Sequence, residues 1–263
     1  MNVFKQELKF QIRSVMYWTG SIAVILLLFM NIFPSFAKDA APLKEALAAF
    51  PSAMFTAIGM DIDTIFEAGG FVSYIYGFIE LFLAIMGALY AYTVMGREKS
   101  ARMNDFLYAK PASRLTIFLQ KLLVCLLVFT FLNGVVFVIF QLLAYNWAID
   151  AKNLSLINQI ILGGFLLQLF MFALATLLSV VMKRIKNPIG SATGLGFGLF
   201  LVLMIGRLMD EPWIKRLTPF GYVEPLDIIK DGLPGLTILG FLAATLLLLA
   251  LSMYLRQTRD LEN

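Results

Sequence analysis

The sequence contains six long apolar runs, and these restrict the folds that the chain can adopt. A helix that rises about 1.5 Å per residue needs roughly 20 apolar residues to cross the hydrocarbon layer of a bilayer. The chain is 60% hydrophobic and only 14% charged, which suits lipid as its solvent. We therefore predict an all-α polytopic membrane protein with one domain over residues 1–263. The six predicted transmembrane spans are 15–36, 70–94, 116–145, 158–182, 188–209 and 235–255.

Residue types that most soluble enzymes rely on are missing from this sequence. It contains no histidine, and its single cysteine, Cys125, lies inside an apolar run. This composition excludes an internal disulfide, a Cys-x-x-Cys site and catalytic centres that need histidine. A Gly-x-x-x-x-Gly-Lys-Ser/Thr motif for binding nucleotide phosphates is also absent. We therefore expect no catalytic residue, no metal site and no cofactor in this chain.

Basic residues indicate how the spans are oriented. If both termini lie in the cytoplasm, 14 of the 21 Lys and Arg residues fall on that side. The positive-inside rule favours this orientation. The net charge of +4 comes from clusters beside apolar runs, so it indicates contact with lipid head groups and not with nucleic acid.

Residues 1–14 carry four apolar residues at near-helical spacing, with three basic residues elsewhere around the turn. The pattern predicts an amphipathic helix on the membrane surface, and a frayed basic tail is the alternative. A cleaved signal peptide is disfavoured, because the first apolar run exceeds the usual 7 to 15 residues or so. The residues that form the pattern are Val3, Phe4, Leu8 and Ile12, and Lys5, Lys9 and Arg13.

The loop 95–115, between the second and third spans, is highly charged but has an apolar stripe. Met103, Phe106 and Leu107 fall on one face of a short helix that Pro111 must end. An exposed helix of this kind suits docking into a groove on a soluble partner. The alternative is a helix that simply lies on the lipid surface.

This loop resembles the coupling loop of ABC-2-type permeases, the transmembrane subunits of bacterial ATP-binding-cassette exporters. That family has the pattern Glu-x-x-x-Gly-Thr-x-Glu-Phe-Leu-Leu-x-x-Pro-x-Ser-Arg, followed by a lysine. The chain departs from it at Arg102 and Met103, where Gly-Thr is usual, and at Tyr108, where leucine is usual. The matching residues are Glu98, Asp105, Phe106, Leu107, Pro111, Ser113 and Arg114, with Lys121 following.

A second match lies between the fifth and sixth spans, where residues 217–232 look like an external segment of the same family. The resemblance implies a short extracellular helical segment there. From their apolar character we expect Leu226, Ile228 and Ile229 to dip into the membrane interface.

The resemblance also implies partners and a location. Two copies of a cytoplasmic ATPase subunit would bind ATP and Mg, and the permease would pair with a second copy of itself or with a sister permease in the bacterial cytoplasmic membrane. The residues coupling it to the ATPase would be Glu98, Arg102, Asp105, Phe106, Leu107, Pro111, Ser113 and Arg114. The spans hold many of the chain's 24 Phe and 13 Met residues, which suits export of an amphipathic or hydrophobic substrate such as a peptide, peptide antibiotic, toxin or drug.

Glu80 lies near the middle of the second span, where an ionised carboxylate costs at least ~2.5 kcal/mol and normally faces protein or water. One hypothesis places it on the translocation pathway. The other is a carboxyl paired within the bundle, because polar contacts between helices are common in membranes. The pathway candidates are Glu80, Asn133, Gln141 and Gln168, and the possible partners of Glu80 are those three amides and Arg207.

Gly190, Gly194 and Gly198 recur at four-residue intervals in the fifth span, so they share one helix face. Small residues on one face let another helix approach closely. The resemblance implies a dimer contact at this helix, centred on Gly194, and packing within one subunit is the alternative.

Two other classes of function stay open from the residues alone. A membrane enzyme acting on lipid would need a catalytic centre, and Glu80 has no carboxylate neighbour at helical spacing. An ATP-independent channel or scaffold would show a polar stripe along several spans, whereas the sequence has only scattered Asn and Gln.

Overall fold

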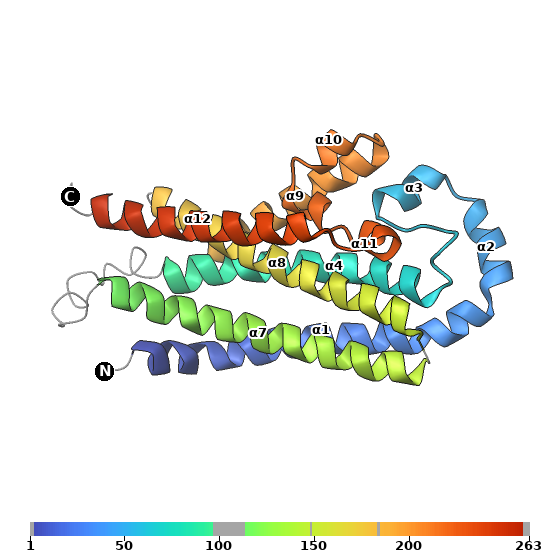
Figure 1. Ribbon diagram of the computed structural model, residues 1–263, viewed down its shortest axis with the longest axis horizontal. Coiled ribbons are helices and arrows are strands. Elements are labelled where there is room, and N and C mark those ends of the chain that lie inside the picture. Colours follow the sequence, from blue (N-terminus) through green and yellow to red (C-terminus); the bar gives the residue numbers. More distant parts are fainter. Residues whose placement is uncertain (1–2, 97–113, 148, 183–184, 260–263) are drawn as a thin grey trace.

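The computed structural model describes residues 3–96, 114–147, 149–182 and 185–259. These residues are almost entirely helical and form no strand, which confirms the all-α prediction (Figure 1). Six of the helices are long and apolar enough to cross a membrane, so the protein is a multi-pass membrane protein. The long helices are α1 (Val3–Lys38), α4 (Ala68–Tyr90), α7 (Arg114–Asn146), α8 (Ala151–Val181), α9 (Pro188–Leu208) and α12 (Gly235–Arg259), and α4 continues into a π-helix, η1 (Ala91–Met95).

Capping side chains set where two of these helices begin. Asp150 accepts a hydrogen bond from the Asn153 backbone N–H, so α8 begins at Ala151, seven residues before the predicted span. Asn187 accepts one from the Gly190 backbone N–H at 3.0 Å, and a proline follows it in the first turn of α9. The polar cap of α8 lies outside the apolar run, so hydropathy alone does not reveal where this helix begins, whereas α9 begins at the predicted residue.

The predicted separate helix at the N-terminus is not present, because residues 3–14 belong to one continuous helix, α1. The buried positions in this stretch are Glu7 and Gln11, whereas Phe10 and Ile12 are 58% and 52% exposed. The reason is the neighbour, because this part of α1 packs against the polar beginning of α7, where Gln120 accepts a hydrogen bond from the Phe4 backbone N–H.

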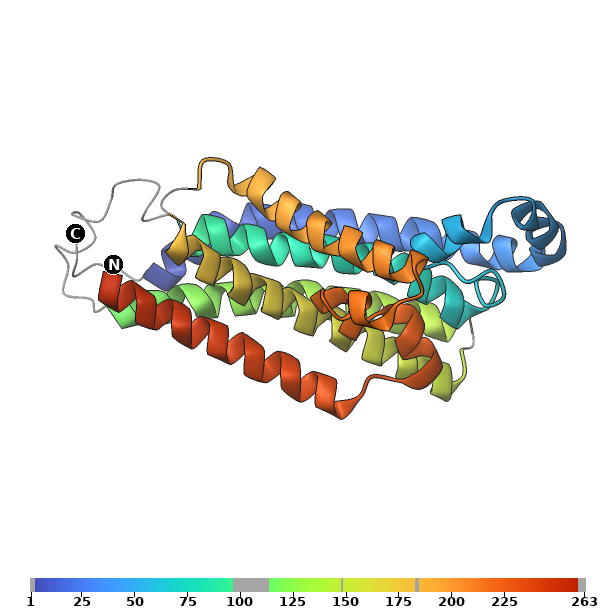
Figure 2. The ribbon, with the colours of Figure 1, turned by 90° about the horizontal axis from the view of Figure 1, so that it is seen from above.

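Helices α4 and α8 form the centre of the bundle and are its most buried spans (Figures 1 and 2). A Cβ atom on Gly87 would lie 2.5 Å from the Gln168 carbonyl oxygen, and one on Gly164 would lie 2.6 Å from the Tyr76 hydroxyl. Both glycines therefore allow these two helices to pack closely. Helix α9 packs on α4 and α12 on α8, while α1 packs mainly on α7.

The remaining helices gather at the end of the bundle opposite the two termini (Figure 1). We call residues 39–67 and 209–234 the cap. The predicted segment between the fifth and sixth spans is part of it and is helical. The cap helices are α2 (Ala40–Ala48), α3 (Ser52–Ala57), α10 (Pro212–Lys215), the 3₁₀-helix η2 (Pro219–Tyr222) and α11 (Pro225–Asp231).

Contrary to the prediction, Ile228 does not project from the cap into the membrane interface. It is only 2% exposed and packs in the hydrophobic core, close to Gly163 of α8. Ile229 is partly buried beside Gly69 at the start of α4. Helix α11 therefore ties the cap to the two central helices by burying its apolar side in protein.

Candidate functional site

Two pairs of amide side chains join α7 to α8 inside the bundle. Asn133 donates to Gln168 at 2.7 Å, and both side chains are buried. Nearer the cap, Gln141 donates to Asn158 at 2.7 Å. Such pairs hold helices together in lipid, where no water competes for the hydrogen bond. Three of the four predicted pathway residues thus make contacts between helices.

Glu80 is the exception among those four residues. Its side chain is 2% exposed, and Oε1 makes no hydrogen bond within the described part of the chain. Among the described residues, neither an amide nor Arg207 forms a hydrogen bond or ion pair with Glu80, because the amides bond to each other and Arg207 bonds to Glu224. A buried polar atom without a partner needs an explanation, and inside a membrane bundle it marks a functional candidate.

A buried ion cluster lies where α9 meets the cap. The Arg207 Nε donates to Glu224 Oε1 at 2.8 Å, and the two residues are 6% and 2% exposed. Lys215 Nζ lies 3.2 Å from the other oxygen of Glu224, and the guanidinium of Arg207 also donates to the Ala57 carbonyl. The cluster therefore joins α9, α10, α11 and the end of α3.

Gly59 makes room for this cluster. Its φ of +73° is one that other residues rarely adopt, and a Cβ atom there would lie 2.7 Å from the guanidinium carbon of Arg207. The chain at the end of α3 can thus approach the arginine closely enough for the Ala57 carbonyl to accept a hydrogen bond. A second ion pair, between Lys230 Nζ and Asp61 Oδ2 at 2.9 Å, joins α11 to the same loop.

Two carboxyl groups of the cap have shifted pKa values. Partial desolvation against the cap and then the neighbouring Glu224 carboxylate raise the pKa of Asp227 above its ordinary value. Burial acts in the same direction on Asp61, but hydrogen bonds from the Lys230 ammonium and the Asp63 backbone N–H outweigh it and lower the pKa of Asp61. Asp61 therefore strengthens the cap above its unfolded-state pKa, and this contribution is lost as the pH falls through its lowered value.

At the opposite end, basic side chains hold the last turn of the π-helix that precedes the predicted coupling loop. Lys121 of α7 donates to the Val94 carbonyl at 3.0 Å, and its Nζ lies 3.9 Å from the Glu7 carboxylate of α1. Arg256 of α12 donates to the Met95 carbonyl. Side chains of α7 and α12 thus bond to the end of η1, and α1 reaches it only through Lys121. π-Helical turns often occur at functional sites.

The predicted coupling residues come directly after that π-helix. Seven of them lie outside the described residues, and α7 begins at the eighth, Arg114. The seven are Glu98, Arg102, Asp105, Phe106, Leu107, Pro111 and Ser113.

The predicted glycine face of α9 is not used for packing within the described chain. A Cβ atom on Gly194 or Gly198 would meet nothing within 4 Å, and Gly190 contacts only the Asn187 cap of its own helix. The glycine that meets α4 is Gly196, where a Cβ atom would lie 2.6 Å from the Ile85 side chain. Within the part of the chain that the structure describes, the glycine face is therefore not packed inside the subunit and is exposed.

The sequence does not predict that the residues of the cap cluster contact one another. From the sequence, Arg207 is a candidate partner of Glu80 only, because both residues belong to spans. Glu224 directly precedes Pro225, and proline is common in the first turn of a helix. This signal predicts that a helix begins beside an acidic residue, near the membrane end of α9. No pattern in the sequence says that Arg207 and Glu224 meet, since folding of the cap alone brings them together.

Breaking the cap cluster should destabilise the protein. Glu224→Gln leaves the Arg207 charge buried without its partner, so we expect a loss of about 3–5 kcal/mol. Cys125 is buried and is the sole cysteine in the sequence, so its reaction with a thiol-specific dye reports unfolding. In a thermal ramp, Glu224→Gln should expose this thiol at a lower temperature, and Asp231→Asn, on the exposed side of the same helix, should not. Equal unfolding temperatures for both variants would mean that the cluster does not hold the cap.

Comparisons with known proteins agree with the helix architecture. The chain matches the family described as ABC-2 family transporter protein over residues 1–261. Neither curated proteins nor solved structures give a significant match. Because the chain has six candidate spans and matches the family model over nearly its whole length, it belongs to the ABC-2 transporter family and is an ABC-2-type permease.

Proposed function

We propose that this chain is the permease subunit of an ATP-driven exporter that works with two copies of a separate ATPase subunit. ATP and Mg would bind to that partner. Both termini and the loop 95–115 would lie in the cytoplasm, with the cap outside. The observation that carries this proposal is the family match over residues 1–261, together with a loop whose coupling pattern comes directly after η1.

The contacts at the end of η1 support a mechanical role for the loop. Any displacement of the chain just after Met95 acts on carbonyl groups that Lys121 and Arg256 hold. Through these two side chains, movement of the loop would reach α7 and α12, and through Glu7 it would reach α1. ATP binding would then favour one arrangement of the spans over another, and a nearly complete switch requires a difference of ~5.5 kcal/mol.

The open glycine face supports pairing with a second permease. Gly194 and Gly198 leave the backbone of α9 uncovered on one side, so a helix of another subunit can approach it closely. A second copy of this chain, or a sister permease with a similar face, would bury that surface.

Glu80 is our candidate for contact with the substrate. It is buried, it lies in a central helix, and its Oε1 has no partner in the described chain. A carboxyl group placed this way suits a cationic or polar group on an otherwise apolar molecule. We therefore propose an amphipathic substrate, such as a peptide, peptide antibiotic, toxin or hydrophobic drug.

Charged substitutions in the loop should separate the permease from its motor. In Phe106→Asp/Leu107→Asp, the apolar stripe that would enter a groove on the ATPase becomes acidic, so we expect Mg-dependent ATP hydrolysis to be lost from the affinity-purified complex. Phe50→Asp makes the same kind of change on an exposed residue of the cap and should leave this activity unchanged. Transport that continues at the wild-type rate after the ATPase is lost would point to a channel instead.

Gly194→Leu should weaken assembly without harming the subunit. No described residue lies where the new side chain begins, so unfolding reported by Cys125 should stay at the wild-type temperature while cross-linked dimers decrease. The contrasting variant is Gly196→Leu, which would collide with Ile85 and should lower the unfolding temperature. An unchanged dimer in Gly194→Leu would remove this face from the interface.

Glu80→Gln tests the substrate contact directly. We expect transport to fall about tenfold, which corresponds to ~1.4 kcal/mol of lost interaction, while the ATPase still co-purifies. The control is Glu67→Gln, an exposed acid just before the same helix. Undiminished transport with normal folding would exclude Glu80 from the pathway.

A further inference from the structure

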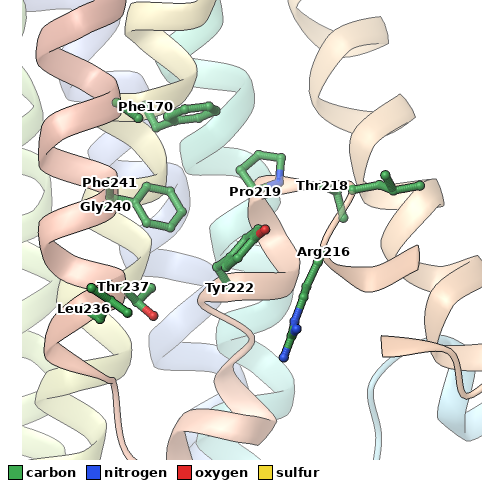
Figure 3. A pocket seen from close by; sticks show the side chains of 11 residues that line it. Phe170, Arg216, Thr218, Pro219, Tyr222, Leu236, Thr237, Gly240 and Phe241 are labelled. Carbon is green, nitrogen blue, oxygen red and sulfur yellow. The ribbon is translucent and has the colours of Figure 1, made fainter. Parts of the chain in front are cut away.

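A pocket of about 470 Å³ lies between α12, α8 and the cap (Figure 3). This volume is within the range of roughly 300–1,000 Å³ that is typical of sites for small molecules. Phe241 and Gly240 of α12 form one wall, Phe170 of α8 forms the inner end, and Pro219 and Tyr222 of η2 form the opposite wall. Neither the amide pairs nor the buried ion cluster of the cap belongs to it.

The polarity of the pocket changes along its length. Phe170 and Phe241 contact each other edge to face, with ring centroids 5.6 Å apart, and make the inner end apolar. Leu236 and Thr237 begin α12 at the cap end, and the side chain of Arg216 extends toward that end (Figure 3). A long molecule in the pocket would therefore meet aromatic rings at one end and a cation at the other.

Two polar groups of the lining have no partner in the described chain. Arg216 is exposed and forms no ion pair or side-chain hydrogen bond with the residues that the structure describes. Thr218 is fully buried, and its Oγ1 makes no hydrogen bond there either. A bound molecule cannot reach the buried Thr218 hydroxyl, but it can reach the exposed guanidinium of Arg216.

The surroundings of the pocket indicate what kind of molecule can enter. Helix α12 is the least buried of the six spans, and Leu236, Leu239 and Leu247 on it are 82%, 64% and 70% exposed. In a membrane, lipid covers these leucines. An arginine at the end of an apolar groove complements phosphate, which it can bind through two parallel hydrogen bonds.

We propose that this pocket binds one anionic phospholipid from the leaflet at the cap end of the protein. One acyl chain would lie along Gly240 and Phe241 toward Phe170, and the phosphate would lie beside Arg216. The lipid would then fill the space between α12 and η2 and connect the sixth span to the cap. This inference uses only the membrane location of the protein and does not depend on the proposed coupling to an ATPase.

The test is retention of lipid by the purified full-length protein. Native mass spectrometry of delipidated protein titrated with phosphatidylglycerol should show one tightly held molecule, and phosphatidylcholine should bind at least about tenfold more weakly. Arg216→Gln should weaken phosphatidylglycerol binding about tenfold, because it removes the charge-assisted hydrogen bonds. Lys152→Gln removes an exposed cation outside the pocket and should leave binding unchanged.

A second variant blocks the apolar part of the pocket. A side chain at Gly240 starts in open space, so Gly240→Leu should fill the groove without disturbing the fold, which the protection of Cys125 monitors. This variant should lose the tightly held lipid. Equal retention of phosphatidylglycerol by the wild type and Gly240→Leu would overturn the proposal, and so would displacement of the lipid by an amphipathic cationic peptide, which would make the pocket a substrate site.

Discussion

Close packing of α4 against α8 is the interaction on which the rest of the bundle depends. In lipid, helices gain little by burying apolar surface, so they must fit closely to stay together. Gly87 and Gly164 permit that fit, because each leaves space for atoms of the opposite helix. The other spans then add to this pair, with α9 on one member and α12 on the other. A shift between α4 and α8 would therefore move every surface that the proposed exporter uses.

Apart from Glu80, the buried Glu, Lys and Arg side chains among the described residues lie at the two ends of the bundle, because placing charge in hydrocarbon is costly. Glu7 and Lys121 lie toward the termini, and Arg207 and Glu224 lie at the cap. Between these levels, the neutral pair Asn133 and Gln168 connects two spans. Each end is thus held by electrostatic contacts, and the middle is held mainly by packing. In the proposed exporter, helices joined in this way would tilt about their centres when one end is pulled.

The contacts at the two ends have different mechanical consequences. At the cap, Arg207 of α9 and Lys215 of α10 both contact Glu224 at the start of α11, so these elements are tied together. At the other end, basic side chains hold a π-helix whose next residues carry the coupling pattern. A lipid between α12 and η2 would add a contact on the side of the cap where the pocket lies. Outward transfer of a substrate would then depend on movement that begins at the π-helix and is resisted at the cap.

Sequence by itself determined the six spans, their approximate ends and the family, because hydrophobic length and a loop motif are local properties of the chain. It also marked Glu80 and the glycine face, but not what surrounds them. Only the tertiary structure decided that Glu80 Oε1 has no partner, that Gly194 faces outward, and that Arg207 meets Glu224. These outcomes depend on the rotation of each helix about its axis and on the path of the cap. Packing between residues far apart in the chain sets both, and no local pattern encodes them.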